Sequence, residues 1–282
     1  MDRMQLGLIG RNIQRSLSPV LQEDALRATG LSGSYRLMDT DLSGQSLGDT
    51  LRLATMSGFV GFNVTFPYKE EIIPLLDKLS PEARKIGAVN TVVVQPDKRL
   101  YGYNTDNFGF VRAFEEAFGQ AAANDKTVVL VGAGGAGRAV AFALLELGVA
   151  CLLIYDNDRS RAAQLVQDVQ NHYVRRASVI EHLDECVAGA DGVVNASPVG
   201  MRGVPGRPVP EDLIEKQEWV ADVVYTPIET EFLKSAHAKG IAFMNGGGMC
   251  VHQAAQAFQL FTGRLPDVER MRRIFGECIS AS

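Results

Sequence analysis

One turn near the middle of the chain restricts the possible folds more than any other feature. Residues 127–139 read TVVLVGAGGAGRA, so a short apolar run leads directly into Gly132-x-Gly134-x-x-Gly137 and then into a helical pattern. This series between a strand and a helix is typical of a dinucleotide-binding βαβ unit, because glycine permits the tight turn, the backbone approach to a pyrophosphate and close helix packing. The alternative is a glycine turn that merely joins strand to helix.

The rest of the chain alternates between strands and helices in the same way. Helical patterns such as Pro19–Ala28, Gly135–Leu147 and Ser160–Val169 separate short apolar runs. The predicted strands are Gln5–Ile9, Ser34–Met38, Phe59–Val64, Thr91–Val94, Thr127–Val131, Ala150–Tyr155, Gly192–Asn195 and Trp219–Val224. This alternation predicts an α/β protein with parallel sheets covered by helices on both faces.

The length of 282 residues suggests two domains. The polar stretch 118–126 (FGQAAANDK) is the predicted connector between them. We expect Trp219 to be a core residue, and we expect the stripe Phe110, Phe114 and Phe118 to be a packing face.

Composition excludes several classes of protein. The net charge of −5 argues against nucleic acid or an anionic membrane as the main partner. The sequence contains no run of 18 or more apolar residues, so we expect no transmembrane helix. The N-terminus lacks a signal-peptide pattern. The four cysteines form no CxxC pair and the four histidines lack metal-ligand spacing. We therefore expect a reduced, cytoplasmic protein without a metal.

The strand after the glycine turn carries a clue to the cofactor. It ends at Asp156, where a carboxylate accepts hydrogen bonds from an adenosine ribose and repels a 2′-phosphate. This favours NAD over NADP. Arg159 and Arg161, just downstream, are able to hold a phosphate, but we favour a solvated helix start for both.

Polar residues gather in three segments of the N-terminal half. The first, GRNIQRSLSP, contains Ser16 and Ser18, although Ser18 is equally well interpreted as a helix N-cap before proline. The second, GFNVTFPYK, places Asn63, Thr65 and Lys69 at and beyond the end of a strand, where ligands of α/β sheets gather.

The third segment combines GAVNT (87–91) with GYNTD (102–106). Its Thr105 and Asp106 are also possible helix caps. A lysine oriented by an aspartate suits proton transfer at a hydroxyl, so Lys69 and Asp106 are candidate acid–base partners. A surface salt bridge is the plainer alternative.

These motifs together resemble the shikimate dehydrogenases. SLSP, NVTFPYK, GAVNT, GYNTD, GAGGAG, NASPVGM (195–201), DVVYTPIET (222–230) and GGMCVHQAAQAF (247–258) occur in that family's order and cover nearly the whole chain. The segment 156–158, Asp-Asn-Asp, resembles the NAD-dependent quinate/shikimate branch, whereas NADP-dependent relatives usually carry Asn-Arg-Thr.

The resemblance implies a fold and a division of the chain. Residues 1–108 and 246–282 would form an α/β substrate-binding domain completed by C-terminal helices. Residues 109–245 would form an inserted Rossmann-type domain, with the substrate in the cleft.

It also implies roles for single residues. Ser16 and Ser18 would bind the substrate carboxylate with Tyr225 nearby, and Asn63 would support this shell. Thr65, Asn90, Asp106 and Gln253 would bind ring hydroxyls, and Lys69 would be the acid/base. The cofactor residues would be Gly132, Ala133, Gly134, Gly135, Ala136, Gly137, Asp156, Arg161, Ser197, Val199, Val223 and Gly246, with Met249 near the nicotinamide.

The implied reaction is hydride transfer between NAD and the ring 3-hydroxyl of shikimate and/or quinate, small hydroxylated cyclic carboxylates. The alternatives are an NADP-dependent biosynthetic enzyme, a dehydrogenase of an amino-substituted shikimate, and a ligand-binding regulator without turnover. The chain would be a monomer or homodimer without nucleic-acid or membrane partners.

Some residues depart from the family pattern. Gln22 replaces a common histidine, and Cys250 and His252 replace aliphatic or small residues. We expect Phe66 to alter packing under the site, and Gly246–Gly248 to be a flexible run.

Overall fold

The structure is a computed structural model that describes residues 3–281. These residues form two compact units. The first contains the described residues up to Thr105 and those from Val251 onward, and the second contains Asp106–Cys250. The second unit is therefore inserted, along the chain, between two parts of the first. The domain limits expected at 108 and 245 remain predictions.

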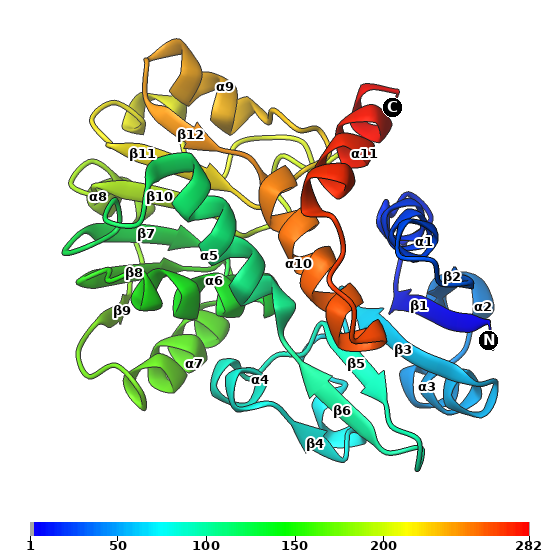
Figure 1. Cartoon of the computed structure of the whole chain (residues 1–282). Helices are drawn as coiled ribbons and strands as arrows, with labels where there is room; N and C mark the ends of the chain where they lie inside the picture. The colour runs from blue at the N-terminus through cyan, green and yellow to red at the C-terminus, as the bar shows by residue number, and fades with distance from the viewer. Residues whose placement is uncertain (1–2, 282) are drawn as a thin grey trace. The chain divides into compact units, whose positions relative to one another are not determined.

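The first unit is built on a six-stranded mixed sheet with the order β2-β1-β3-β5-β6-β4 (Figure 1). Its strands are β1 (Met4–Gly10), β2 (Gly33–Asp39), β3 (Phe59–Val64), β4 (Lys78–Leu79), β5 (Thr91–Val94) and β6 (Leu100–Tyr103). β1 is parallel to β2 and β3, whereas β5 is antiparallel to β3 and β6. Because of this reversal, the carboxyl ends of β1 and β3 lie at the same edge as the first residue of β5.

Helices and a shared apolar core complete this unit. Its helical elements are α1 (Ser18–Ala28), α2 (Thr40–Ser43), α3 (Leu47–Met56), the 3₁₀ turn η1 (Ile73–Leu75), α4 (Pro81–Ile86) and α11 (Val268–Ser280). α4 begins at Pro81 because Ser80 Oγ accepts the Ala83 N–H at 3.1 Å and proline suits the first turn. Leu47 and Leu51 of α3 share the core with apolar side chains of the sheet.

The second unit is built on a six-stranded parallel sheet with the order β12-β11-β10-β7-β8-β9. Its strands are β7 (Thr127–Val131), β8 (Cys151–Tyr155), β9 (Ala177–Val179), β10 (Gly192–Asn195), β11 (Trp219–Asp222) and β12 (Ala242–Met244). The strand order reverses between β7 and β10. In doubly wound sheets, ligands bind beyond the carboxyl ends of the strands at this switch point.

Helices cover both faces of the second sheet. They are α6 (Gly135–Glu146), α7 (Arg159–Gln170), α8 (Leu183–Val187), the 3₁₀ turn η2 (Glu211–Leu213) and α9 (Glu231–Ala238), while α5 (Thr105–Phe118) and α10 (Gly246–Thr262) begin or end in the first unit. α8 and α9 pack on the face that carries Val220. α5 packs on the opposite face, where the ring centroids of Phe114 and Trp219 are 4.8 Å apart.

The predicted α/β class is confirmed, and each predicted strand is present. The prediction that the sheets are parallel was wrong for the first sheet, because the short connection between β5 and β6 can join only antiparallel strands. The aromatic stripe of α5 is a packing face, and Trp219 is a core residue with 2% exposure, both as predicted. β4, β9 and β12, with two or three residues each, were not predicted. They are edge strands too short to show a periodic pattern. β6 was also not predicted.

The predicted connector was wrong. The stretch after Phe118 joins α5 to β7 inside the second unit, and the chain passes between the units at Thr105–Asp106. The physical reason is that α5 packs on the second sheet through Phe114 and Phe118, both against Trp219.

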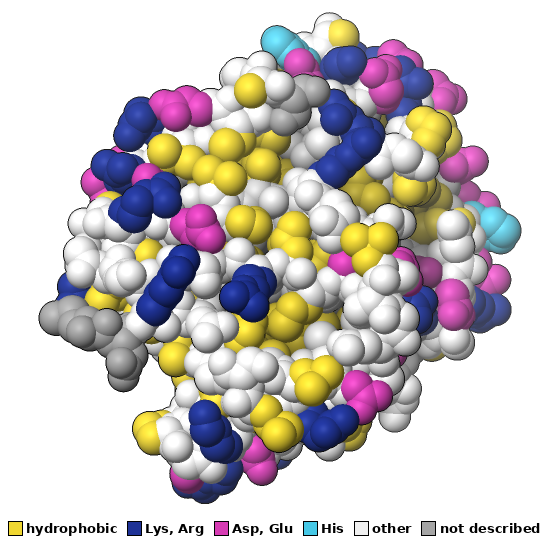
Figure 2. Space-filling model, turned by 90° about the vertical axis from the view of Figure 1, so that its right-hand side faces the viewer, with side chains coloured by type: hydrophobic (Ala, Val, Ile, Leu, Met, Phe, Trp, Pro, Cys, Tyr) yellow, Lys and Arg dark blue, Asp and Glu magenta, His cyan; other side chains and the backbone are white. Residues whose placement is uncertain are grey.

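Basic side chains do not gather into one patch on the face drawn in Figure 2, where they lie singly or in small groups among apolar and uncharged atoms. Within residues 3–281, none of the helices has the length and apolar character needed to span a membrane.

Candidate active site

Two of the polar segments meet at the carboxyl edge of β1 and β3. The Thr65 N–H donates to Ile9 O at 3.0 Å. A Cβ placed on Gly10 would lie 2.5 Å from Thr65 Cγ2, so the two turns are in direct contact. The segments 10–19 and 61–69 are therefore neighbours, and both follow strands of the same sheet.

Two buried asparagines join the second segment to the third. Asn63 Nδ2 donates to Asn90 O at 3.2 Å and to Thr91 Oγ1 at 3.0 Å. Asn63 Oδ1 accepts a hydrogen bond from the Tyr35 hydroxyl at 2.8 Å. Both ends of this amide are therefore engaged by the protein, which fits a supporting role.

Asn90 connects the same edge to helix α5. Its Oδ1 accepts the Thr105 N–H at 2.8 Å, and its Nδ2 donates to Thr105 Oγ1 at 2.9 Å. That hydroxyl also lies 3.4 Å from Gln253 Oε1 on α10. Asn90 and Gln253, which are far apart in the sequence, are thus linked through Thr105. Thr105 therefore does more than cap a helix, and its signal in the sequence is its place in the polar turn GYNTD.

Ser16 and Ser18 form a pair at the start of α1. Ser16 Oγ donates to Ser18 Oγ at 3.1 Å, and the Ser18 N–H donates to Ser16 Oγ at 3.2 Å. The cap residue of α1 is Leu17, with no side-chain hydrogen bond, so the alternative interpretation of Ser18 as an N-cap was wrong. Pro19 in the first turn already removes one N–H that a cap would satisfy. The adjacent hydroxyls are suited to donate to a carboxylate.

Lys69 lies in the turn that follows β3 and includes the cis peptide bond Phe66–Pro67. Its backbone oxygen accepts the Val89 N–H at 2.7 Å, and its side chain is half-buried. The lysine is therefore fixed beside the segment that carries Asn90. Asp106 is the first residue of the second unit, so its pairing with Lys69 remains a prediction.

Within the second unit, Cys250 and Asp106 both act on Tyr225. The Cys250 thiol is the largest cause of the raised pKa of Tyr225, followed by burial and by the charge of Asp106. Tyr225 is therefore a neutral phenol with an O–H to donate at neutral pH. Cys250, which departs from the family pattern, therefore lies in the surroundings of Tyr225, a predicted substrate residue.

The glycine turn has the geometry of a phosphate-binding turn. Gly132 has a φ of 103°, and a Cβ there would lie 2.8 Å from Ser197 N. A Cβ on Gly137 would lie 2.0 Å from Gly132 O. Only glycine fits either position, so α6 starts directly beyond the carboxyl end of β7. Its first N–H groups and helix dipole suit the pyrophosphate of a dinucleotide.

Asp156 braces this turn. Its Oδ2 accepts the Ala133 N–H at 2.8 Å, and its Oδ1 accepts the Asp158 N–H at 2.8 Å. Each oxygen keeps a further lone pair for a ribose hydroxyl. The carboxylate therefore stands beside the glycine turn, where an adenosine ribose would bind.

The two nearby arginines differ in their surroundings. Arg159 forms an ion pair with Glu181 at 2.5 Å. Arg161 Nη1 lies 3.9 Å from the position of a Cβ on Gly134. Arg161 is therefore the arginine placed to meet a phosphate at the turn.

A buried pair at the ends of β10 and β11 supports the neighbouring loop. Asn195 and Asp222 are register partners with no exposed surface, and Asn195 Nδ2 donates to Asp222 Oδ1 at 2.9 Å. Asn195 Oδ1 accepts the N–H and the hydroxyl of Ser197 at 3.1 and 2.6 Å, and its Nδ2 donates to Val199 O at 3.0 Å. In the sequence, the only signal for Asp222 is its position at the end of a strand, before Val223.

Two expectations about local packing were wrong. Phe66 is 72% exposed, because the turn directs its side chain to solvent rather than under the site. Gly246–Gly248 are not a flexible run but the first turn of α10. A Cβ on Gly248 would lie 3.1 Å from Ala113 Cβ, so a small residue allows close packing there.

The predicted residues are distributed over both units. The first holds Ser16, Ser18, Asn63, Thr65, Lys69, Asn90 and Gln253, and the second holds Asp106, Tyr225 and all the predicted cofactor residues, among them the buried Met249. No group of three or more His, Cys, Asp or Glu side chains in the described part of the chain is arranged to hold a metal ion.

Comparison with known proteins decides the family. Residues 8–92 match the model of the shikimate dehydrogenase substrate binding domain, residues 114–199 match shikimate / quinate 5-dehydrogenase, and residues 246–274 match the shikimate 5′-dehydrogenase C-terminal domain. A quinate/shikimate dehydrogenase (NAD(+)) of Corynebacterium glutamicum strain R is 46% identical over 281 residues, 97% of this chain and 98% of that protein. The chain belongs to the shikimate dehydrogenase family.

Other shikimate dehydrogenase family members are similarly close. A shikimate dehydrogenase (NADP(+)) of Streptomyces avermitilis is 45% identical over 276 residues, 96% of this chain and 94% of that protein. The solved quinate dehydrogenase from Corynebacterium glutamicum in complex with NAD has a TM-score of 0.91 and 44% identity, covering 98% of this chain and 100% of that chain. The resemblance seen in the motifs is confirmed.

Proposed function

We propose that this shikimate dehydrogenase family member is an oxidoreductase that transfers hydride between NAD and the ring 3-hydroxyl of shikimate and/or quinate. The observation that carries the proposal is the convergence of hydroxyl and amide side chains with Lys69 at one edge of the first sheet. Two similar proteins are named as dehydrogenases of quinate or shikimate, which supports the same conclusion.

The side chains at this edge suit a polyhydroxylated cyclic carboxylate. The paired hydroxyls of Ser16 and Ser18 would donate to the carboxylate. Thr65, Asn90 and Gln253 would take the ring hydroxyls. A substrate without one of these hydroxyls would leave buried polar groups unpaired, so the site would reject it.

Lys69 would move the proton at the 3-hydroxyl oxygen, and Asp106 would orient the lysine and that hydroxyl. The glycine turn and Asp156 would hold NAD, which supplies the hydride acceptor when it is bound. Glycine-only contacts at Gly132 and Gly137 support this assignment. The alternative cofactor is NADP, and the observation that supports it is the position of Arg161 beside Gly134.

Steady-state kinetics with shikimate, quinate and an amino-substituted shikimate, each with NAD and NADP, test the proposal. We expect turnover of shikimate or quinate with NAD, and a loss of kcat of roughly 10²- to 10⁴-fold in Lys69→Ala. Lys78→Ala, which changes an exposed lysine of the same unit, is the matched control and should keep its rate.

Turnover of none of the three acids, or a full rate in Lys69→Ala, would contradict the proposed reaction. Calorimetric binding of shikimate or quinate without turnover would instead indicate the ligand-binding regulator.

We also propose a cytoplasmic protein, monomeric or homodimeric, whose partners are small molecules rather than nucleic acid or membrane, and which needs no metal. The net charge of −5 and the scattered basic side chains on the face drawn in Figure 2 support the absence of a nucleic-acid or membrane partner. Light scattering of the purified protein and activity in the presence of a chelator test the assembly and the metal independence.

A further inference from the structure

Hydrogen-bond donors surround the carboxylate of Asp222. Its Oδ1 accepts the Asn195 Nδ2 at 2.9 Å and the Val224 N–H at 3.0 Å, and its Oδ2 accepts the Thr230 hydroxyl at 2.7 Å. The side chain has no exposed surface. A carboxylate accepts from all three donors, whereas an asparagine would turn its NH₂ group toward Thr230, whose hydroxyl would have to reverse its hydrogen bond. An acid is therefore the side chain that matches these donors as they stand.

These bonds fix the turn that follows β11. Asp222 holds the Val224 N–H directly, and the Gly246 N–H at the start of α10 donates to Val224 O at 3.2 Å. A Cβ on Gly246 would lie 2.2 Å from Val223 O, so helix and turn pack without space for a side chain. Val223 and Gly246, two residues of the proposed cofactor site, thus depend on the placement of this turn.

Through Asn195, the same carboxylate controls a second loop. Asn195 Nδ2 donates to Asp222 Oδ1 and to Val199 O. Asn195 Oδ1 accepts the Ser197 N–H. The Ser197 N–H lies against Gly132 of the phosphate-binding turn. The placement of Ser197 and Val199 is therefore coupled to Asp222 through Asn195.

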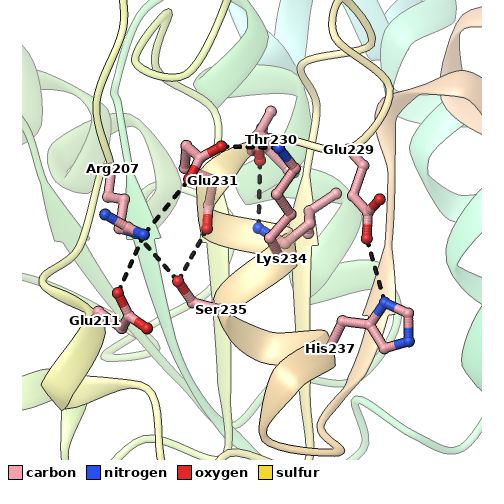
Figure 3. Close-up of polar contacts among 10 residues, drawn as sticks. Arg207, Glu211, Glu229, Thr230, Glu231, Lys234, Ser235 and His237 are labelled. Carbon is pink, nitrogen blue, oxygen red and sulfur yellow. Dashed lines mark hydrogen bonds and ion pairs between the residues drawn. The ribbon is translucent and has the colours of Figure 1, made fainter.

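Asp222 is braced on its far side by helix α9. Thr230, which donates to Asp222, caps this helix by accepting the Leu233 N–H at 3.3 Å, and its backbone oxygen accepts the Lys234 N–H at 2.9 Å (Figure 3). In the same view Arg207 binds Ser235 of the helix and approaches Glu211. The support behind Asp222 is therefore a capped helix rather than a loop.

We propose that Asp222 is a positioning residue for the cofactor: it sets the backbone of Val223 directly and that of Ser197 and Val199 through Asn195, without contacting the dinucleotide. The inference rests on the proposed function, because it takes the carboxyl edge of the second sheet as the cofactor site.

Asp222→Asn tests this role. We expect the Kd of NADH, measured by calorimetry, to rise about tenfold or more, since the loss of one hydrogen bond of the charged group corresponds to that factor. KM for NAD should rise similarly, while KM for the ring substrate should change less than about threefold. A merely structural role would lower the active fraction, and so kcat, without this split.

Asp191→Asn is the matched control. Asp191 Oδ2 accepts the Thr127 N–H at 2.7 Å, so it ties strands of the same sheet at their opposite, amino-terminal edge. We expect its Kd for NADH to equal that of the unchanged protein. If Asp222→Asn does not fold, two variants of Thr230 test the same role. Thr230→Val removes the hydrogen bond to Asp222 and should weaken NADH binding. Thr230→Ser keeps this bond and should keep NADH binding.

An unchanged Kd in Asp222→Asn or Thr230→Val, or an equal rise in Asp191→Asn, would overturn the positioning role. If the unchanged protein binds neither NADH nor NADPH, the proposed function fails first, and the two failures are thereby distinguished.

Discussion

At the scale of single residues, cofactor preference depends on the charge of Asp156. The carboxylate also accepts the N–H groups of Ala133 and Asp158, so alanine would loosen the glycine turn as well as remove the charge. Asp156→Asn keeps an acceptor oxygen and removes only the charge. We expect the ratio of kcat/KM for NAD over NADP to fall about tenfold or more in Asp156→Asn, because a 2′-phosphate is no longer repelled.

Arg161→Met in the Asp156→Asn background should reverse the gain in NADP use, because Arg161 is the cation beside Gly134. A ratio that does not move in Asp156→Asn would show that this residue does not select the cofactor.

The pKa of Asp222 is a second property of a single residue that can be measured. Burial raises this pKa from 3.8 to about 6, although the hydrogen bonds that Val224, Thr230 and Asn195 donate lower it. Between these pH values the folded protein holds a proton at Asp222 that the unfolded chain has lost. The free energy of unfolding contributed by this group therefore falls as the pH rises through this window.

Asp222→Asn lacks this titration. The free energy of unfolding of the unchanged protein, minus that of the variant, should be larger near pH 4.5 than near pH 7.5 by roughly 2 kcal/mol. Urea titrations at the two pH values measure the difference. A difference that is constant with pH would contradict the raised pKa of Asp222.

At the scale of elements, the approach of α6 to β7 depends on one contact. A Cβ on Gly137 would meet Gly132 O at 2.0 Å, so Gly137→Ala must displace the helix or the turn. We expect a loss of roughly 1–3 kcal/mol in the free energy of unfolding, together with weaker NADH binding. Thermal unfolding and calorimetry measure the two effects.

Gly276→Ala is the control within a helix. Gly276 is exposed on α11, and a Cβ there meets no atom within 4 Å. Alanine should stabilise that helix by roughly 0.5–1 kcal/mol. Stability and NADH binding that survive Gly137→Ala would show that the turn tolerates a side chain.

At the scale of the whole molecule, the C-terminal segment completes the first unit. Gln22 Nε2 of α1 donates to Ala254 O of α10 at 2.9 Å. Arg270 of α11 binds Asp24 of α1 through two hydrogen bonds of 2.6 and 2.9 Å, and only 8% of the Asp24 side chain is exposed. The residues after Val251 are therefore part of the unit that holds the proposed substrate site.

Removing Arg270 should loosen this connection. The hydrogen bond from Arg270 holds the pKa of Asp24 below its usual value, so the pair stabilises the fold above pH 3.8 and the contribution is lost as the pH falls. We expect Arg270→Met to lower the Tm by several degrees at neutral pH, with a smaller effect in acid. Arg273→Met, which breaks an exposed pair with Glu277, should lower it by less than about 1 °C. Equal effects would show that the Asp24 pair does not hold α11.

The sequence by itself determined the α/β class, the family and the place of the glycine turn. These depend on local patterns: apolar periodicity selects strand or helix, and Gly132-x-Gly134-x-x-Gly137 lies within a single βαβ unit. The family motifs are likewise contiguous, so they are visible without knowledge of contacts.

The tertiary structure alone decided which side chains support the site. Thr105 joins Asn90 to Gln253, and Asp222 joins Asn195 to Thr230, through bonds between residues distant in the sequence. It also placed α5 on the second sheet, Phe66 in solvent and Gly246 in a helix. The physical reason is that burial and hydrogen-bond partners are properties of neighbours in space, and the sequence lists neighbours only along the chain.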